Sequence, residues 1–560
     1  MSWSRRSFIK KVGIAGAGTL AGGTAIISAC QGPPRYDILI TGGIIVDGSG
    51  EAAYTGDIGI VGEQIVEIGD LASYGAKRSI DATGMIVAPG FIDIHSHTDL
   101  SLFVSPSADS KIKQGVTTEV AGQDGSSRAP MTNERLEIQQ KGYGEKYDVD
   151  IDWTDFSGYF DALDRREIGV NFASFVGQGT IRDMVVGKDN VRATARQIDE
   201  MKALVEQSMA GGAWGLSSGL EYTPGSFASK EEIAELCKAA QSYGGIYSTH
   251  LRNEDDRLVD AVEEAIWTAR EAVIPLQIAH FKSIGTRNID KIAQCFDLIE
   301  KANAEGMDIT VDRYPYIAYA TTLQNLFPTS FRDGGAEAFV KRLQSRRVAA
   351  QMKRAAVAKV DLLGDWSHVM VSTVSDSNKQ YIGMRVSEIV EGTGEDPFEF
   401  VRNLLIEEKG NVGMIGFGMS DEEIKSVLTH PLAMIASDGG AVADTGPLSG
   451  GQPHPRRYGT FPRVLGLYCR ERQYFKMPEA IYKMTGMPAK RLGLKDRGKI
   501  DVGYAADIVA FNPETVIDHA DFFNPHQHAT GIEYVLVNGS IAVDQGQHSG
   551  ALAGKVLRRG

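Results

Sequence analysis

The pattern that most constrains the fold of this chain is a series of eight short apolar runs that alternate with amphipathic segments. The runs lie at residues 91–94, 117–121, 170–176, 213–217, 246–249, 274–279, 308–311 and 432–436. Between two of them, Leu258, Val262, Ala265, Ile266 and Ala269 recur at helical spacing and share one face of a helix. Eight strand-like runs separated by helices are typical of a parallel (β/α)8 TIM barrel, so the predicted fold class is α/β.

The two ends of the chain differ from this central part. Residues 36–80 contain short β-type stretches broken by Gly-rich turns, and similar stretches return from Ile500 onward. We therefore expect the two ends to pair in one β-sandwich domain beside the barrel. The predicted parts are a signal at 1–30, sandwich strands at 31–88, the barrel at 89–490 and further sandwich strands at 491–560.

One interval of the barrel region, at about 320–429, is too long to be an ordinary connection between a strand and a helix. It contains a basic, helix-prone stretch at 341–359 and a ninth apolar run at 412–417. We predict that most of this interval is an insertion near the mouth of the barrel.

The composition narrows the classes of protein that the chain can belong to. With 42% hydrophobic and 23% charged residues, it is neither fibrous nor disordered. Its 72 acidic and 58 basic residues give a formal net charge of −14, which argues against nucleic acid as a partner. The four cysteines form no CxxC pair, so neither a disulfide framework nor a structural zinc cluster is expected.

The N-terminus resembles an export signal. Arg5 and Arg6 precede an apolar, Gly- and Ala-rich run, as in twin-arginine signals, and Ile27-Ser28-Ala29-Cys30 resembles a lipobox. We expect export by the twin-arginine route, lipidation at Cys30, and a periplasmic or cell-surface protein that touches the membrane only through this anchor. A plain transmembrane anchor is the alternative, although the run is only marginally long enough to span a bilayer.

Four of the 11 histidines end strand-like runs: His95 and His97 follow the first run, His250 the fifth and His280 the sixth. The carboxyl ends of barrel strands all open onto one face, so these imidazoles are expected to converge. The i, i+2 spacing of His95 and His97 places both side chains on one side of an extended segment, where two nitrogens can bind one ion. The sequence therefore predicts a metal site.

Two carboxylates follow strands at the same end of the barrel. Asp124 lies in the turn after the second run and is a candidate metal ligand, while Asp438 follows the last run. Hydrolysis with a metal needs a group that accepts a proton from water and returns it to the leaving group, and one carboxylate can do both. Asp438 suits this role; alternatively, it is simply part of an Asp-Gly turn.

Several motifs resemble a known family. The segment Gly90-Phe91-Ile92-Asp93-Ile94-His95-Ser96-His97, together with Ser437-Asp438, is similar to the amidohydrolase superfamily. Other segments resemble its D-aminoacylase (N-acyl-D-amino-acid deacylase) branch; these are His454-Pro455-Arg456, the motif from Gly459 to Gly466, Asp312-Arg313-Tyr314-Pro315-Tyr316, and Gly-Lys-Val-Leu at 554–557. The resemblance covers essentially the whole chain after the signal.

This resemblance implies a barrel flanked by a β-sandwich and a zinc-dependent activity. By analogy, His250 and His280 hold one tightly bound zinc, His95 and His97 form a weaker second site, and Asp438 is the acid/base. The resemblance further implies that the substrate is bound by Lys282, Tyr314 and Arg456, which hold its carboxylate, and by Tyr222, which lines the pocket.

The chain departs from the family at one position. Well-known D-aminoacylases carry a cysteine where this chain has Asp124. A carboxylate is a harder ligand than a thiolate and can bridge two ions, so manganese and cobalt become plausible metals beside zinc. Glu119 is the alternative carboxylate ligand.

The function that these features imply is hydrolysis of the amide bond of an N-acyl-D-amino acid, or of a dipeptide with a C-terminal D-residue. Two alternatives remain open: an amidohydrolase that acts on a cyclic amide such as a hydantoin, and a non-catalytic, lipid-anchored binding protein. The motif at 454–466 argues against the first, and the presence of Asp438 with all four histidines argues against the second.

Overall fold

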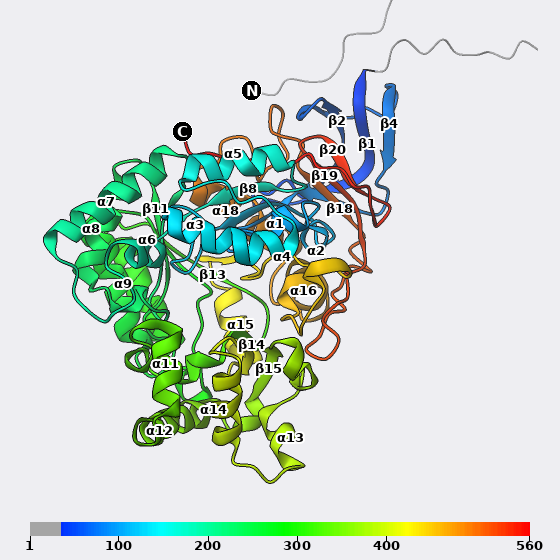
Figure 1. Cartoon of the computed structure of the whole chain (residues 1–560). Coiled ribbons are helices and arrows are strands. Elements are labelled where there is room, and N and C mark those ends of the chain that lie inside the picture. Colours follow the sequence, from blue (N-terminus) through cyan, green and yellow to red (C-terminus); the bar gives the residue numbers. More distant parts are fainter. Residues whose placement is uncertain (1–34) are drawn as a thin grey trace, which may run out of the picture.

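A computed structural model describes residues 35–560, and the predicted export signal with Cys30 lies outside the described residues. Figure 1 shows a barrel with its surrounding helices, a sheet domain that combines the first and last strands, and a lobe formed by the insertion. Among residues 35–560, no helix is long and apolar enough to cross a membrane.

The barrel strands coincide with all eight predicted runs, which confirms the predicted fold class. They form a six-stranded parallel sheet in the order β17-β13-β12-β11-β10-β9 and a three-stranded one in the order β6-β7-β8. A parallel bridge between Ser96 and Gly439 joins the first strand to the last. The strands are β6 (Phe91–Asp93), β7 (Val116–Ala121), β8 (Asn171–Ser174), β9 (Val176–Gly177), β10 (Gly215–Gly219), β11 (Ile246–His250), β12 (Leu276–Ile278), β13 (Ile309–Arg313) and β17 (Ala433–Ile435).

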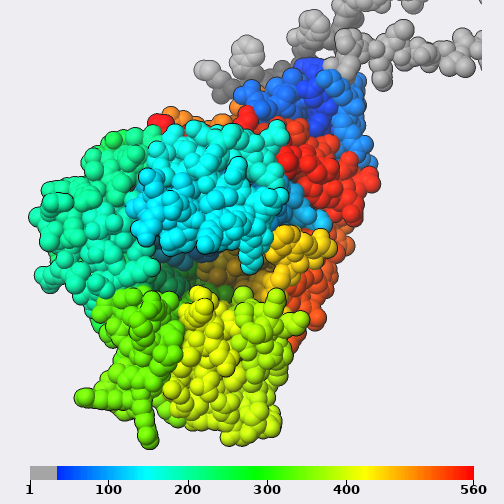
Figure 2. Space-filling model, in the orientation of Figure 1, coloured from blue at the N-terminus to red at the C-terminus, as the bar shows by residue number. Residues whose placement is uncertain are grey.

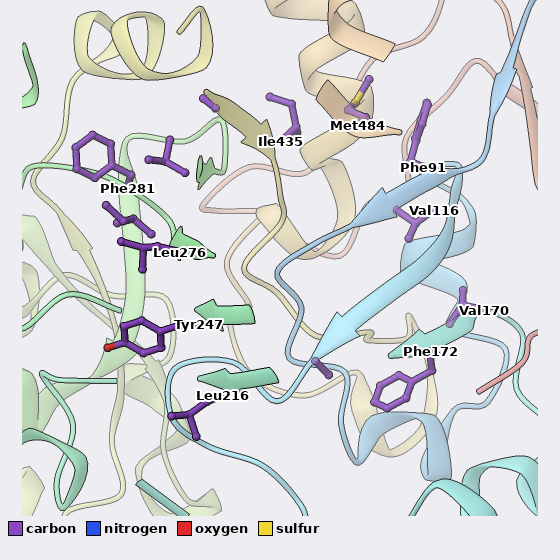
Figure 3. Packing of buried hydrophobic residues seen from close by; sticks show 14 of the residues in the cluster. Phe91, Val116, Val170, Phe172, Leu216, Tyr247, Leu276, Phe281, Ile435 and Met484 are labelled. Atoms are coloured by element: carbon purple, nitrogen blue, oxygen red, sulfur yellow. The ribbon is translucent and has the colours of Figure 1, made fainter. Parts of the chain in front are cut away.

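The barrel helices pack apolar side chains against these strands. Figure 3 shows part of this core, with side chains of the strands such as Phe172, Leu216 and Tyr247. In α9 the buried face contains the five residues that the sequence pattern placed together, since Leu258, Val262, Ala265, Ile266 and Ala269 are all buried. The helices are α5 (Phe156–Arg166), α6 (Gln178–Val185), α7 (Ala195–Ala210), α8 (Lys230–Gln241), α9 (Leu258–Ala272), α10 (Lys291–Ala304), α15 (Asp421–Leu428), α17 (Met477–Met484) and α18 (Gly486–Leu492).

Shorter helices occupy further connections of the barrel. They are α1 (Ser101–Val104), α2 (Asp109–Ile112), α3 (Asn133–Gln139), η1 (Gln140–Gly144), α4 (Glu145–Tyr147), α16 (Arg456–Arg463) and η9 (Val464–Glu471). The predicted motif at 454–466 thus contains all of α16 and the beginning of η9.

The sheet domain combines both ends of the chain, as predicted. Strand β5 pairs antiparallel with β18, so that residues 86–89 lie beside residues 508–511. A shared core of mainly isoleucine side chains from both ends fills the domain. Its strands are β1 (Tyr36–Ile45), β2 (Tyr54–Val61), β3 (Gln64–Gly69), β4 (Ala76–Asp81), β5 (Ile86–Pro89), β18 (Ile508–Phe511), β19 (Ile532–Val537), β20 (Ser540–Asp544) and β21 (Gln547–His548).

The insertion lies between β13 and β17 and has its own hydrophobic core. The predicted ninth apolar run is the central strand of its antiparallel sheet, and the predicted basic helix lies largely in α12. Figure 2 shows the surface hollowed between this lobe and the barrel. Its elements are β14 (Ala318–Thr322), α11 (Gly335–Gln344), α12 (Arg346–Leu363), β15 (Val369–Thr373), α13 (Val386–Glu391), α14 (Pro397–Glu407) and β16 (Gly413–Phe417).

Candidate metal and substrate site

The predicted metal ligands meet at the carboxyl ends of the barrel strands. Three groups of side chains have ligand atoms that all lie within 4.8 Å of one another. Two of them contain Asp124: the first is His95, His97, Asp124 and Asp438, and the second is Asp124, His250 and His280. The third group is Glu221, His250 and Glu254. Asp124 belongs to the first two groups, so its carboxylate would be shared if each of them held an ion.

The two oxygens of Asp124 face different pairs of imidazoles. Oδ1 lies 3.4 Å from Nε2 of His280 and 3.7 Å from Nε2 of His95. Oδ2 lies 3.5 Å from Nε2 of His97 and 4.0 Å from Nδ1 of His250. Ligands bound tetrahedrally at about 2.1 Å from zinc lie about 3.4 Å apart, so these separations suit ligands around an ion better than hydrogen-bonded partners.

Buried atoms of this cluster lack hydrogen bonds. Among residues 35–560, Nε2 of His95 and Oδ1 of Asp124 are inaccessible to solvent and have no hydrogen-bond partner. Such unpaired buried polar atoms are costly unless a ligand satisfies them. The donor set of imidazoles and carboxylates therefore fits a divalent metal such as zinc.

The backbone is also unusual at three of these positions. Asp124, His280 and Asp438 have φ values of 53°, 34° and 50°, in the left-handed region that disfavours residues with a Cβ atom. Strained conformations of this kind are retained mainly where a precise side-chain position is needed. Each of the three residues follows a barrel strand, where the chain turns sharply and directs the side chain into the cluster.

Two carboxylates that the sequence analysis missed orient the histidines. Oδ1 of Asp312 lies 3.2 Å from Nδ1 of His95 and accepts a 2.8 Å hydrogen bond from the backbone N–H of His280. Oε1 of Glu254 lies 3.0 Å from Nδ1 of His280. A carboxylate behind a ligating imidazole sets its tautomer and orientation. Asp312 begins the segment Asp312-Arg313-Tyr314-Pro315-Tyr316, and Glu254 follows His250 by four residues. Neither position in the sequence shows which imidazole the carboxylate contacts.

Glu119, the alternative ligand, lies in a different network. Its Oε1 accepts hydrogen bonds of 2.7 Å from the hydroxyls of Ser96 and Thr98, and it lies 3.0 Å from Nζ of the buried Lys111. It belongs to neither of the two groups that contain Asp124. The geometry therefore favours Asp124 as the carboxylate ligand.

Lys111 itself was not predicted by any sequence signal. Its ammonium group donates to the side chains of Asp93 and Ser437, both at 2.7 Å, and to the carbonyl of Gly439 at 2.6 Å. Because it bonds to the residues on both sides of Asp438, it anchors the turn that carries this carboxylate.

The predicted substrate residues line one cavity of about 1020 Å³ with the cluster. Arg456 donates a 2.7 Å hydrogen bond to Asp438, and its guanidinium lies 4.7 Å from the ring centre of Tyr314. Lys282 donates a 2.5 Å hydrogen bond to Glu254. The structure therefore brings all three predicted carboxylate anchors into the cavity, and the two cationic ones, Arg456 and Lys282, are each already paired with an acidic side chain.

The remaining predicted substrate residue, Tyr222, lies on the other side of the cluster. Its ring centre is 4.9 Å from that of His250, and its hydroxyl lies 3.3 Å from that of Thr321 in the insertion. Thr321 also lines the cavity. The insertion, which carries Thr321, therefore forms part of the wall.

The charges of the site are strongly coupled. Burial alone would raise the pKa of Asp438, but the guanidinium of Arg456 and the contact with His97 hold it well below its usual range. For Lys282, burial would lower the pKa, yet the adjacent carboxylate of Glu254 raises it. Lys282 is therefore cationic and Asp438 is anionic in this arrangement.

Comparisons with known proteins place the chain in a family. A model of the amidohydrolase family matches residues 78–543. This chain is a member of the amidohydrolase family. It is 34% identical to D-aminoacylase of Alcaligenes xylosoxydans xylosoxydans, over 94% of this chain and 98% of that one. The N-acyl-D-glutamate and N-acyl-D-aspartate deacylases of the same organism are 32% and 33% identical, over 94% of this chain and 97% and 96% of theirs.

Solved structures of amidohydrolases agree with these matches. A crystal structure of D-aminoacylase is similar with a TM-score of 0.78 and 34% identity, over 93% of this chain and 100% of that one. N-acyl-D-glutamate deacylase from Bordetella bronchiseptica, complexed with zinc and a phosphonate inhibitor, has a TM-score of 0.79 and 30% identity, over 93% and 99% of the chains. The predicted resemblance to the D-aminoacylase branch of amidohydrolases is thus confirmed. An L-hydantoinase, at 15% identity and a TM-score of 0.54 over 93% and 100% of the chains, shares the fold.

Proposed function

We propose that this amidohydrolase is a metal-dependent deacylase. It hydrolyses the amide bond of an N-acyl-D-amino acid, or of a dipeptide with a C-terminal D-residue, to a carboxylate and a D-amino acid. The observation that carries the proposal is the single cavity in which two metal-binding groups share Asp124 and lie beside Arg456 and Lys282. The 34% identity to D-aminoacylase over nearly the whole chain supports the choice of substrate.

The candidate metal ligands would form two neighbouring sites. His250, His280 and Asp124 would hold one ion, and His95 and His97 would hold a second, weaker one with the shared Asp124. Zinc suits the imidazoles, and the carboxylate in place of a thiolate makes manganese or cobalt acceptable as well. When bound, such an ion polarises the acyl carbonyl and lowers the pKa of water.

The side chains of the protein position the substrate and move the proton. Arg456, Lys282 and Tyr314 bind the carboxylate of the D-residue, and Arg456 suits this role because a guanidinium binds a carboxylate with two parallel hydrogen bonds. Tyr222 closes the pocket on the side of His250.

Asp438 lies between the two regions, 3.1 Å from Nε2 of His97 and 2.7 Å from Arg456. It accepts a proton from the attacking water as the oxygen of that water bonds to the acyl carbon. The same proton then passes to the amide nitrogen as the carbon–nitrogen bond breaks, so one carboxylate serves both steps.

A direct assay tests this function. The metal-replete mature protein is offered paired N-acyl-D- and N-acyl-L-amino acids together with hydantoins, and release of free amino acid is measured. We expect turnover of D-substrates only. Turnover confined to hydantoins would instead support the cyclic-amide alternative, and no turnover of any substrate would support a binding protein.

We also propose that the protein is exported by the twin-arginine route and anchored through a lipid on Cys30. The adjacent Arg5 and Arg6 and the Ile27-Ser28-Ala29-Cys30 ending support this localisation.

A further inference from the structure

One histidine of the cavity wall has no role in the proposed mechanism. His454 is 2% exposed and lies just before α16, two residues ahead of the carboxylate anchor Arg456. Its Nδ1 lies 3.1 Å from the backbone nitrogen of Arg456, and its Nε2 lies 2.9 Å from the carbonyl oxygen of Ala318. Both ring nitrogens therefore bind the protein, and neither remains for a substrate.

The two partners fix the tautomer of this ring. The carbonyl oxygen of Ala318 only accepts hydrogen bonds, so Nε2 of His454 carries the proton and donates it. The backbone N–H of Arg456 only donates, so Nδ1 is unprotonated and accepts. Burial and the positive charge of Arg456 hold the pKa of His454 well below its usual range, which agrees with a neutral ring.

The acceptor side of His454 holds the beginning of α16. The first N–H groups of a helix have no partner within the helix. The imidazole accepts from the N–H of Arg456, the first residue of α16, and the backbone carbonyl of His454 accepts a 3.1 Å bond from the N–H of Arg457. The backbone of Arg456 is therefore fixed at the point from which its guanidinium reaches Asp438 at 2.7 Å.

The donor side of His454 holds the insertion. Ala318 is the first residue of β14, and Tyr319 and Thr321 of the same strand line the cavity. One imidazole thus connects the helix that carries Arg456 to the strand through which the insertion contributes to the cavity wall.

Aromatic side chains hold the imidazole in this orientation. The ring centre of His454 lies 5.3 Å from that of Tyr316 and 5.1 Å from that of Phe522, and the rings are nearly perpendicular, at 89° and 87°. Edge-to-face contacts of this kind favour one orientation of a ring. Phe522 comes from the connection between β18 and β19, and its carbonyl accepts a 2.7 Å hydrogen bond from Gln452. The packing therefore supports the two hydrogen bonds of His454.

We propose that His454 is a positioning residue that fixes Arg456 relative to Asp438 and to the insertion, without binding the substrate itself. The proposal rests on the proposed function, in which Arg456 binds the substrate carboxylate. Displacement of such an anchor by about 1 Å lowers turnover by about a hundredfold, because the reacting groups are no longer aligned. His454 therefore acts on catalysis through Arg456.

Two amide variants separate the roles of the two nitrogens. Oδ1 of asparagine is as many bonds from Cβ as Nδ1 of histidine, so His454→Asn keeps the acceptor for Arg456 and loses the donor to Ala318. Nε2 of glutamine matches Nε2 of histidine in the same way, so His454→Gln keeps the donor to Ala318 and loses the acceptor for Arg456. His454→Phe keeps an aromatic ring and loses both hydrogen bonds.

The measurement uses the N-acetyl-D-amino acid that the metal-replete wild type hydrolyses fastest, with its carboxylate free or amidated. We expect the ratio of kcat/KM for free over amidated substrate to fall at least about tenfold in His454→Gln and His454→Phe, mainly through KM, because the buried N–H of Arg456 loses its acceptor. His454→Asn should keep the ratio within about threefold of wild type. Bound metal and the circular dichroism spectrum should stay unchanged in all three variants.

His526→Gln is the matched control. His526 also contacts α16, since its Nδ1 lies 3.2 Å from the hydroxyl of Tyr458 and its Nε2 lies 3.2 Å from the carbonyl oxygen of Gly451. Among residues 35–560 it has no hydrogen bond to Arg456, so the ratio in this variant should equal that of wild type. If His454 served only packing, its substitution would lower kcat/KM for the free and amidated substrates by the same factor.

The outcomes distinguish these possibilities. An unchanged ratio in both His454→Gln and His454→Phe, or an equal loss in His454→Asn, overturns the proposal. Equal rates of wild type on the free and amidated substrates would instead refute the carboxylate clamp of the proposed function. A crystal structure of His454→Gln then still tests His454, because Arg456 should no longer lie 2.7 Å from Asp438. An unchanged contact in that structure would overturn the positioning role.

Discussion

At the scale of single residues, the site depends on side chains that the sequence separates by hundreds of positions. His95 and Asp438 meet through a 2.8 Å hydrogen bond between the backbone N–H of Asp438 and the carbonyl of His95. This bond lies where the first and last barrel strands join, so closure of the barrel completes the metal cluster. Substitutions of individual ligands and of Asp438 therefore test distinct parts of the proposed mechanism.

Removal of a metal ligand should remove the ion and leave the fold intact. In His250→Ala or His280→Ala we expect loss of the tightly bound metal and of turnover, because each imidazole contributes to the group with Asp124. Metal content by mass spectrometry and the circular dichroism spectrum are the measurements. His519→Ala is the control, since His519 contacts Thr530 far along the chain from these ligands. Full metal occupancy in both ligand variants would refute the assignment.

Asp438→Asn should separate chemistry from binding. The amide cannot accept the proton of the attacking water, so kcat should fall by at least about 10². The ion held by His250 and His280 should remain, and substrate affinity should change little. Steady-state kinetics combined with metal analysis measure both effects, and a kcat near that of wild type would exclude Asp438 from the mechanism.

Arg456 and the carboxylate of the substrate should be energetically coupled. Arg456→Ala, or amidation of the substrate carboxylate, should each cost about 2–5 kcal/mol in kcat/KM, the range for losing one partner of a buried charge pair. The two losses should not add, because either change removes the same interaction. Arg456→Ala also frees Asp438, so the measurement is the ratio of kcat/KM for free over amidated substrate in each protein. An equal ratio in both proteins would contradict the carboxylate clamp.

At the scale of elements, helix α15 is joined to the loop after β12 by a buried carboxylate. Oε1 of Glu423 accepts a 3.1 Å hydrogen bond from the backbone N–H of Ser283 and lies 3.5 Å from Arg313. Burial raises the pKa of Glu423 to about 7, and the nearby Arg313 only partly opposes this shift. The folded protein therefore favours the protonated side chain.

This shift predicts a pH dependence of stability. A carboxyl whose folded pKa is raised stabilises the fold fully below its unfolded pKa, near 4.5, and loses that contribution as pH rises through about 7. The Tm of wild type minus that of Glu423→Gln should therefore fall between pH 5 and pH 7.5. The exposed neighbour Glu422 on the same helix provides the control, since Glu422→Gln should show a constant difference. A constant difference for Glu423→Gln as well would disprove the shift.

At the scale of the whole molecule, three parts of the chain combine around one cavity. The barrel supplies the candidate metal ligands and α16 supplies Arg456. The insertion completes the wall with Tyr319, Thr321 and Asn325. The sheet domain joins the beginning and the end of the described chain and packs beside the barrel (Figure 1).

The proposed export of the whole protein is testable in cells. Arg5→Lys combined with Arg6→Lys should retain the precursor in the cytoplasm, because the two adjacent arginines define a twin-arginine signal. Cys30→Ala should abolish labelling with a radioactive fatty acid while export continues. Fractionation and labelling are the measurements, and Cys237→Ala is a control at a buried cysteine of the barrel. Normal membrane association of both signal variants would indicate a plain anchor.

The sequence by itself determined the features that depend on local patterns. Apolar runs located the barrel strands, and helical periodicity located the buried face of α9. A helix that is buried on one side carries its apolar residues at a fixed spacing along the sequence. The histidines at the ends of these runs followed from the same pattern, since all strands of a parallel barrel end on one face.

Only the tertiary structure decided which side chains surround the ligands. Lys111 reaches the turn that carries Asp438, more than 300 residues further along the chain, and Glu221 faces a wall formed by the insertion. No period or spacing encodes such contacts, because they depend on how separate elements pack and on which charges remain unpaired once they are buried. The choice of Asp124 over Glu119 has the same origin: Glu119 lies within β7 and Asp124 just after it, and only packing directs Asp124 to the histidines and Glu119 to Lys111.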